Sequence, residues 1–186
     1  MKFVAYIFLL FATCSLCAQD FTKIRMDYAQ TDGYSPMWRM DKDREAITDL
    51  WDEGKIEEGM KLAEKWLEKV PVDIQMQGWY SHFLETKGDF SGSIKHYFIK
   101  LGLIHSITSS GTGLSPDSPW KVISVHEEYD ILGNIGAQLI SQSLGKTSEG
   151  RPCDVMVCKI GEKKITLYFD VSISMEATSK LLNPSE

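Results

Sequence analysis

Four side chains capable of acid–base chemistry follow one another near the middle of the chain. They are His126, Glu127, Glu128 and Tyr129, within the segment PWKVISVHEEYDIL. A carboxylate beside an imidazole suits general acid–base catalysis, but catalysis also needs a second group positioned at the substrate. Both glutamates fall in the predicted first turn of a helix, where the helix dipole favours carboxylates. A structural role is therefore favoured over a catalytic one.

A glycine-rich segment, SGTG, precedes these residues. Gly111 and Gly113 could present backbone amides to a phosphate, but the lysine and the following Ser or Thr of a P-loop are missing. The surrounding SITSSGTGLSPDSPW is dense in turn-forming residues, which predicts a connecting loop. No cofactor and no metal are predicted, because the histidines lack ligand spacing. These histidines are His82, His96, His105 and His126.

The elements around the candidate residues are a short strand and a helix. Lys121–Val125 reads as an apolar strand. Ser124 and Glu127 have capping-box spacing, which predicts a helix over Val125–Ile135. Glycines then weaken the helix, and residues 137–144 fit either a strand or a helix.

The C-terminal part predicts a β-hairpin from Cys153–Ile160 and Ile165–Ile173, whose apolar residues alternate. With a loop of two or four residues, the expected pairs on the core face are Ile160 with Ile165, Cys158 with Leu167, and Met156 with Phe169. The other face is too apolar for water alone, so a helix, or otherwise a ligand, should cover part of it. That face carries Val155, Val157, Tyr168 and Asp170.

Two cysteines remain outside the N-terminal segment, Cys153 and Cys158. In one strand their α-carbons would lie about 16 Å apart at roughly 3.3 Å per residue. A disulfide needs less than about 7 Å, so two free thiols are predicted, with Cys158 buried.

The first half contains two stretches that align at an offset of 34 residues, with Leu50 on Leu84. Each has a turn glycine, Gly54 or Gly88, and a small residue five positions later. This pattern resembles the tetratricopeptide repeat, which either binds peptides and proteins or serves as scaffold. The predicted helices are Arg44–Glu53, Ile56–Val70, Ile74–Lys87 and Ser91–Ile107. Two units are fewer than a free solenoid needs, so they should pack on the rest of the chain.

Residues 20–42 show no clear period, and we expect irregular chain lying on these helices.

The N-terminus has the three parts of a secretory signal peptide: Lys2, the apolar run FVAYIFLLFA and a small residue at Ala18. This run is too short to span a bilayer, and no second one follows. Lipidation of Cys14 or Cys17 is the alternative, although the residues before each fit a lipoprotein signal poorly. A periplasmic or secreted protein is expected.

Cleavage after Ala18 leaves 168 of the 186 residues, with 19 basic against 26 acidic side chains and a net charge of −7. This balance, without a basic run, argues against nucleic acid and anionic membranes as partners. The length predicts one α+β domain over residues 19–186. Its mainly helical repeat part would span 19–108, and its loop, helix and β-sheet part 109–186.

Five blocks in the sequence, in their order and spacing, resemble an exported bacterial family of the Bacteroidetes type, domain of unknown function 4919. The blocks are SSGTG, PWKVISVHEEYDIL, QSLG, CDVMV and LYFDVS. The resemblance covers most of the mature chain and implies export, helices first and a small sheet last, but no activity. The positions it offers as binding candidates are Gly111, Gly113, Glu127, Glu128, Tyr129, Asp154, Tyr168 and Asp170.

Two functions compete on this basis. The favoured one is a non-enzymatic envelope protein that binds a protein, a peptide or another ligand, because a helical repeat is present and a catalytic pattern is missing. The alternative is a hydrolase-type enzyme with a carboxylate and histidine site near residues 109–130. It would require several of a small set of side chains to converge in one pocket. That set is His126, Glu127, Glu128, Tyr168 and Asp170.

Overall fold

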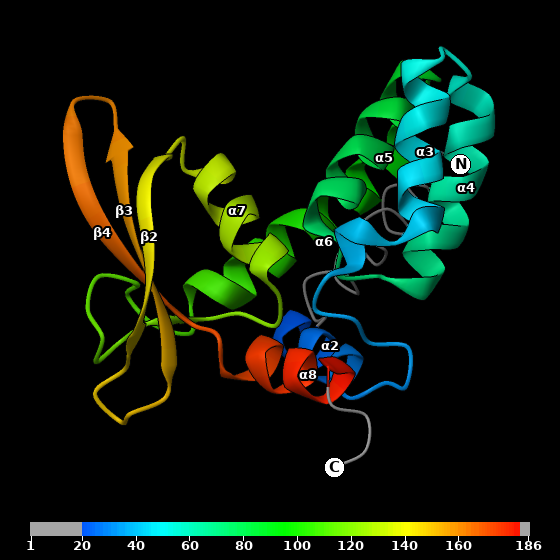
Figure 1. The fold of residues 1–186 in the computed structure, drawn as a ribbon. Helices are drawn as coiled ribbons and strands as arrows, with labels where there is room; N and C mark the ends of the chain where they lie inside the picture. The colour runs from blue at the N-terminus through cyan, green and yellow to red at the C-terminus, as the bar shows by residue number, and fades with distance from the viewer. Residues whose placement is uncertain (1–19, 183–186) are drawn as a thin grey trace, which may run out of the picture.

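The computed structural model describes residues 20–182 and shows an α+β fold, with helices first and a four-stranded sheet afterwards (Figure 1). The elements in chain order are α2 (Phe21–Tyr28), the 3₁₀ turn η1 (Trp38–Met40), α3 (Lys42–Asp52), α4 (Ile56–Lys69), α5 (Ile74–Thr86), α6 (Phe90–Thr108), β1 (Trp120–Lys121), α7 (Val125–Asn134), β2 (Gln138–Lys146), β3 (Pro152–Ile160), β4 (Lys163–Asp170) and α8 (Ser172–Leu182). The predicted leader and its two cysteines lie outside the described residues.

The four helices α3 to α6 form two packed pairs. Helix α3 packs on α4, α5 packs on α6, and α4 also contacts α5. Their ends lie within two residues of the predicted ones. Gly54 and Gly88 have φ values of 76° and 80°, which confirms the left-handed turn residue expected within each pair.

Small residues stand where the paired helices approach closely. A Cβ atom on Gly59 would lie 2.3 Å from Nε1 of Trp51, so only glycine fits there without a rearrangement. Ser93 is buried, and the Ser81 hydroxyl donates to its carbonyl oxygen at 2.9 Å. Gly59 and Ser93 are the small residues found five positions after the turn glycines in the sequence, and close packing between the helices accounts for both.

The expectation of irregular chain over residues 20–42 is wrong for its first third, which forms helix α2. Asp20 caps this helix by accepting a hydrogen bond from the amide of Lys23 at 2.9 Å. Helix α2 packs on α6, with the Phe21 ring against Gly102. Its buried residues are Arg25 and Tyr28, and Phe21 and Ile24 pack partly buried against the core. This apolar stripe is only two turns long and includes a buried arginine, so it is a weak helix signal.

The sheet has the strand order β1-β4-β3-β2, and β1 runs parallel to β4 while the other pairs are antiparallel. Strand β1 covers only two residues, so the predicted strand Lys121–Val125 is too long. The chain leaves the sheet early because Ser124 already caps helix α7. Of the residues 137–144, all but the first fall within strand β2, which settles the choice between strand and helix.

The predicted register of the hairpin is wrong by two residues. Pairing Ile160 with Ile165 requires a four-residue loop, whereas the two-residue turn Gly161-Glu162 pairs Ile160 with Lys163. The observed pairs are Cys158 with Ile165, Met156 with Leu167, and Asp154 with Phe169. The shift is even, so the predicted inward-facing residues still share the buried face. Both cysteines are free and Cys158 is buried, as predicted, and Cys153 is buried as well.

The predicted strand Ile165–Ile173 is also too long at its end, and a second helix, α8, follows it. Asp170 stops the strand because its Oδ1 accepts hydrogen bonds from the amide and the hydroxyl of Ser172, at 3.1 and 2.5 Å. Helix α8 then lies beside α2, below the sheet and the paired helices (Figure 1). The half of the chain after the loop therefore holds two helices where one was predicted.

A buried ion pair links the N-terminal helix to the second half of the chain. Arg25 of α2 and Glu127 of α7 meet through two hydrogen bonds of 2.8 and 2.6 Å, and their side chains are 1% and 0% exposed. Arg25 also donates to the Lys121 carbonyl and the Ser106 hydroxyl. Glu127 accepts a further bond from the amide of Ile123 at 2.8 Å. The pair thus connects α2, α6, the end of β1 and α7.

The close packing at Gly59 generates a prediction with a matched control. We expect Gly59→Ala to lower the free energy of unfolding by about 1–3 kcal/mol, because overpacking outweighs the helix propensity of alanine. Gly133→Ala in α7, where a Cβ meets no atom within 4 Å, should raise it by roughly 0.5–1 kcal/mol. Urea unfolding of both variants measures this, and a stabilised Gly59→Ala variant would contradict the packing.

Candidate functional site

Helix α7 carries the candidate acidic residues and begins at the predicted cap. The Ser124 hydroxyl accepts a hydrogen bond from the amide of Glu127 at 3.2 Å. The Glu127 carboxylate does not return to Ser124, because Arg25 and the amide of Ile123 already occupy it. Glu127 therefore has a full set of partners and no oxygen directed to a ligand.

Glu128, the next residue, is equally buried but lies beside Asp154 of β3. Neither of its carboxyl oxygens receives a hydrogen bond from the described residues. Burial, followed by the charge and the hydrogen-bonding contact of Asp154, raises the pKa of Glu128 to about 9. Glu128 is consequently protonated at neutral pH, and its own proton can supply the missing hydrogen bond to Asp154.

A chain of hydrogen bonds reaches Asp154 from the other side. The Tyr129 hydroxyl donates to Oε1 of Gln142 at 3.0 Å, and Nε2 of Gln142 donates to Oδ2 of Asp154 at 2.5 Å. Three predicted site residues, Glu128, Tyr129 and Asp154, therefore meet, and Gln142 joins them. We refer to these four residues as the Asp154 cluster. Sequence reasoning missed Gln142 because its position became clear only once β2 was known to pair with β3.

The Asp154 cluster borders a pocket of 460 Å³ between α8, the start of α7 and the sheet. Its apolar wall consists of Pro36, Met37, Val125, Leu144, Val171, Met175 and Leu182. Its polar residues are Asp154, Ser174, Thr178 and Ser179. Asp154 is the one charged side chain among these lining residues, so the pocket combines an apolar wall with a single carboxylate.

The two glycines of the SGTG loop have packing roles. The Trp120 indole donates to the carbonyl of Gly111 at 3.0 Å, and the amide of Tyr168 donates to the carbonyl of Gly113 at 2.9 Å. A Cβ on Gly111 would lie 2.4 Å from the Pro119 carbonyl oxygen, and one on Gly113 2.5 Å from the Trp120 ring. The loop thus closes around Trp120 and joins the edge of β4.

Tyr168 and Asp170 face the opposite side of the sheet from Asp154, because Asp154 pairs with Phe169 between them. Asp170 accepts a hydrogen bond from Nε of Arg151 at 2.7 Å. Burial alone would raise the pKa of Asp170, but the hydrogen bonds from Ser172 and Arg151 outweigh it and lower that pKa. These two residues are not part of the Asp154 cluster.

His126 lies against the Trp38 ring, with 5.8 Å between the ring centroids. Burial, reinforced by the charge of Arg39, lowers the pKa of His126 to about 4, so its imidazole is neutral at pH 7. The side chains of the proposed hydrolase site therefore contact different partners: Glu127 contacts Arg25, Asp170 contacts Arg151, and His126 contacts Trp38. They do not converge in one pocket.

A row of exposed apolar side chains follows helix α6. Phe90, Ile94, Tyr97, Phe98 and Leu101 are between 38% and 64% exposed, and their spacing places them on one side of the helix. We refer to this surface as the α6 face. The sequence did not reveal the α6 face, because α6 has apolar residues on several sides. The sequence alone does not show which of these sides a neighbouring helix covers.

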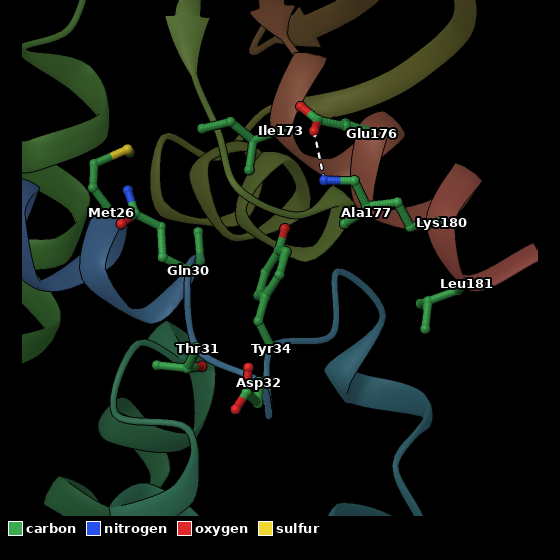
Figure 2. A pocket seen from close by; sticks show the side chains of 11 residues that line it. Met26, Gln30, Thr31, Asp32, Tyr34, Ile173, Glu176, Ala177, Lys180 and Leu181 are labelled. Carbon is green, nitrogen blue, oxygen red and sulfur yellow. Dashed lines mark hydrogen bonds and ion pairs between the residues drawn. The ribbon is translucent and has the colours of Figure 1, made fainter. Parts of the chain in front are cut away.

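A second pocket, of 650 Å³, lies between the end of α2 and helix α8 (Figure 2). Glu176 and Lys180 cross one side of it as an ion pair of 2.7 Å. The Tyr34 hydroxyl donates to the Ile123 carbonyl, and burial raises the pKa of Tyr34. These three side chains are already paired within the chain, and the polar lining also includes Gln30, Thr31 and Asp32.

Comparison with known proteins shows the family of this chain. The profile of a family described as a domain of unknown function, DUF4919, matches residues 11–180. Neither the curated proteins nor the solved structures contain a match. Within residues 20–182, no helix is long and apolar enough to cross a membrane, and no group of three or more potential ligands is arranged to hold a metal ion.

The protonated state of Glu128 generates a prediction about stability. The pKa of Glu128 is about 9 in the folded protein, above its ordinary value of 4.5. The contribution of protonated Glu128 to the free energy of unfolding is therefore fully present below pH 4.5 and is lost as the pH rises toward 9. Glu128→Gln, which mimics the protonated acid, should remove this loss. Between pH 5 and pH 8 the unmodified protein should lose about 2 kcal/mol or more of unfolding free energy relative to the Glu128→Gln variant. Urea titrations at both pH values test this, and a constant difference would contradict the assigned state.

Proposed function

Because the chain belongs to the DUF4919 family, whose description states no activity, we propose its role from its own surfaces. We infer that it is an exported, non-enzymatic protein of the cell envelope that binds another protein through the α6 face. The single observation that carries this proposal is the row of five exposed apolar side chains on α6.

The size of the α6 face supports a binding role. With 150–250 Å² for a whole aromatic side chain, its five residues expose on the order of 500 Å². The largest apolar patch of a typical monomer is about 300–600 Å² and is often functional. With an equal contribution from a partner, the buried area approaches the roughly 1,000 Å² expected of a specific interface.

The position of the α6 face also supports this role. Helix α6 is the last of the two helical pairs, and its opposite side packs against α5 through contacts such as Ser93 with Ser81. In a helical repeat array, the next unit would pack on the side of α6 that is exposed here. The tetratricopeptide-like pattern in the sequence adds weight, because such repeats commonly present helix surfaces to other proteins.

The charges along α6 favour a different protein over a second copy of this chain. From Phe90 to His105 the helix carries Lys95 and Lys100 but no acidic residue, although the protein as a whole is acidic. Lys100 lies on the side of α6 that meets Gly78 of α5, whereas Lys95 flanks the α6 face. Antiparallel pairing of two copies would leave Lys95 without an acidic partner on the other α6. We therefore propose a partner whose apolar surface is bordered by Asp or Glu side chains.

A charge placed in the α6 face should abolish binding. We expect the Ile94→Glu, Phe98→Glu double variant to lose a partner that the unmodified protein retains from cross-linked envelope extracts. Met40→Glu is the matched control, because Met40 is 71% exposed and lies outside α6. It should retain the same partner, identified by mass spectrometry.

Two results of this experiment would contradict the proposal. One is that the unmodified protein retains no protein beyond those found with the double variant. The other is that the unmodified protein is a dimer by light scattering and that the double variant is a monomer, because a second copy would then occupy the α6 face.

Export is tested separately from binding. If residues 1–18 form a cleaved leader, the protein isolated from the periplasm or the medium should begin at Gln19, and intact mass spectrometry can measure this. A lipid-modified mass beginning at Cys17, or at Cys14, would support the lipoprotein alternative instead. An uncleaved Met1 on protein from the cytosolic fraction would contradict export.

A further inference from the structure

We propose that the pocket beside the Asp154 cluster binds a small organic ammonium compound with an apolar tail, and that Asp154 holds its charged end. This pocket is separate from the α6 face and lies between α8, the start of α7 and β3. The inference goes beyond the proposed protein-binding role and does not depend on it.

The charge of the pocket selects a cation. Its lining includes neither lysine nor arginine, and Asp154 is its one charged residue. An anionic ligand would meet this carboxylate without a compensating positive charge, whereas an ammonium group would form an ion pair partly shielded from water. A neutral apolar ligand would leave the carboxylate desolvated and unpaired.

Asp154 is held in place for this role by groups on two elements. Gln142 of β2 donates to its Oδ2 at 2.5 Å, and Tyr129 of α7 orients Gln142 through its amide oxygen. Glu128 lies behind Asp154, fully buried and without a hydrogen-bond donor of its own from the described residues. Since Glu128 is protonated at neutral pH, the two carboxyl groups carry one negative charge between them. Glu128 is thus a positioning residue, and Asp154 is the residue that contacts the ligand.

Oxygens on α8 can accept the remaining protons of an ammonium group. The Ser174 hydroxyl donates to the Val171 carbonyl at 3.0 Å, and the Thr178 hydroxyl donates to the Ser174 carbonyl at 2.7 Å. Both hydroxyls have therefore used their donors within the helix, and their oxygens remain as acceptors. An ammonium group has three donors and no acceptor, which matches a pocket lined by one carboxylate and by hydroxyl oxygens.

The remaining wall suits an apolar tail of moderate length. It includes Met37, Leu144, Met175 and Leu182. The volume of 460 Å³ falls within the roughly 300–1,000 Å³ usual for small-molecule pockets. An unbranched chain of about six carbons would contact this wall with its ammonium end at Asp154, so hexylammonium is a suitable probe.

The test compares hexylammonium with 1-hexanol and hexanoate, which share its tail, by NMR titration of the purified protein at pH 7 and fixed ionic strength. We expect hexylammonium to bind with a millimolar dissociation constant and to shift amide signals of α8 and β3. Hexanol should bind at least tenfold more weakly, and hexanoate should cause no shift. Equal binding of hexylammonium and hexanol, no binding of hexylammonium, or shifts confined to other elements would overturn the proposal.

Variants separate the ligand contact from the positioning role. Asp154→Asn should weaken hexylammonium binding at least tenfold, whereas Glu128→Gln should retain it within about threefold, because the Gln amide can still donate to Asp154. Met175→Lys, at a 41% exposed position in the pocket wall, should abolish binding by placing a resident ammonium near Asp154. This last variant keeps the test decisive if Asp154→Asn fails to fold. Unchanged binding in Met175→Lys or in a folded Asp154→Asn variant would refute the site.

Discussion

The buried ion pair between Arg25 and Glu127 fixes helix α2, at the start of the chain, against helix α7 in the half that contains the sheet. The arrangement of these two halves depends on it. Both side chains are withdrawn from water, which is unfavourable unless every donor and acceptor finds a partner. The structure meets this requirement with groups from α6, from the end of β1 and from the segment before α7. Helix α2 therefore cannot move away from α7 without leaving a buried charge uncompensated, and this holds α7 at a defined position against the sheet.

The same constraint sets the state of the neighbouring residue. Successive residues on a helix point about 100° apart, so fixing Glu127 toward α2 directs Glu128 toward β3. There it meets Asp154 and no arginine, and it is protonated at neutral pH, whereas Glu127 is paired with Arg25. Two identical side chains, adjacent in sequence, thus serve opposite purposes. One joins parts of the fold, and the other positions a carboxylate at the wall of a pocket.

The sequence predicted the local structure well where the signal was local. The helices α3 to α6, the cap at Ser124 and the alternation of β3 and β4 follow from neighbouring residues, and the turn glycines marked the ends. The failures have different causes. The hairpin register depended on the length of its loop, and β1 ends early because Ser124 already caps α7. Helix α2 was missed because it is short and buries an arginine whose partner is distant in the chain. Among the candidate residues, Glu128, Tyr129 and Asp154 come together, whereas Glu127, Gly111 and Gly113 have structural partners. Arg25, 102 positions before Glu127, could not be matched to it from spacing alone.

If the buried ion pair holds α2 against α7, a double-mutant cycle on Arg25→Met and Glu127→Leu will reveal it. Each single variant should lose about 3–5 kcal/mol of unfolding free energy by urea titration, because each leaves a buried charge unpaired. The double variant should lose much less than the two losses combined, giving a coupling of about 2 kcal/mol or more. Single losses below about 1 kcal/mol that simply add in the double variant would show that the pair does not hold these elements together.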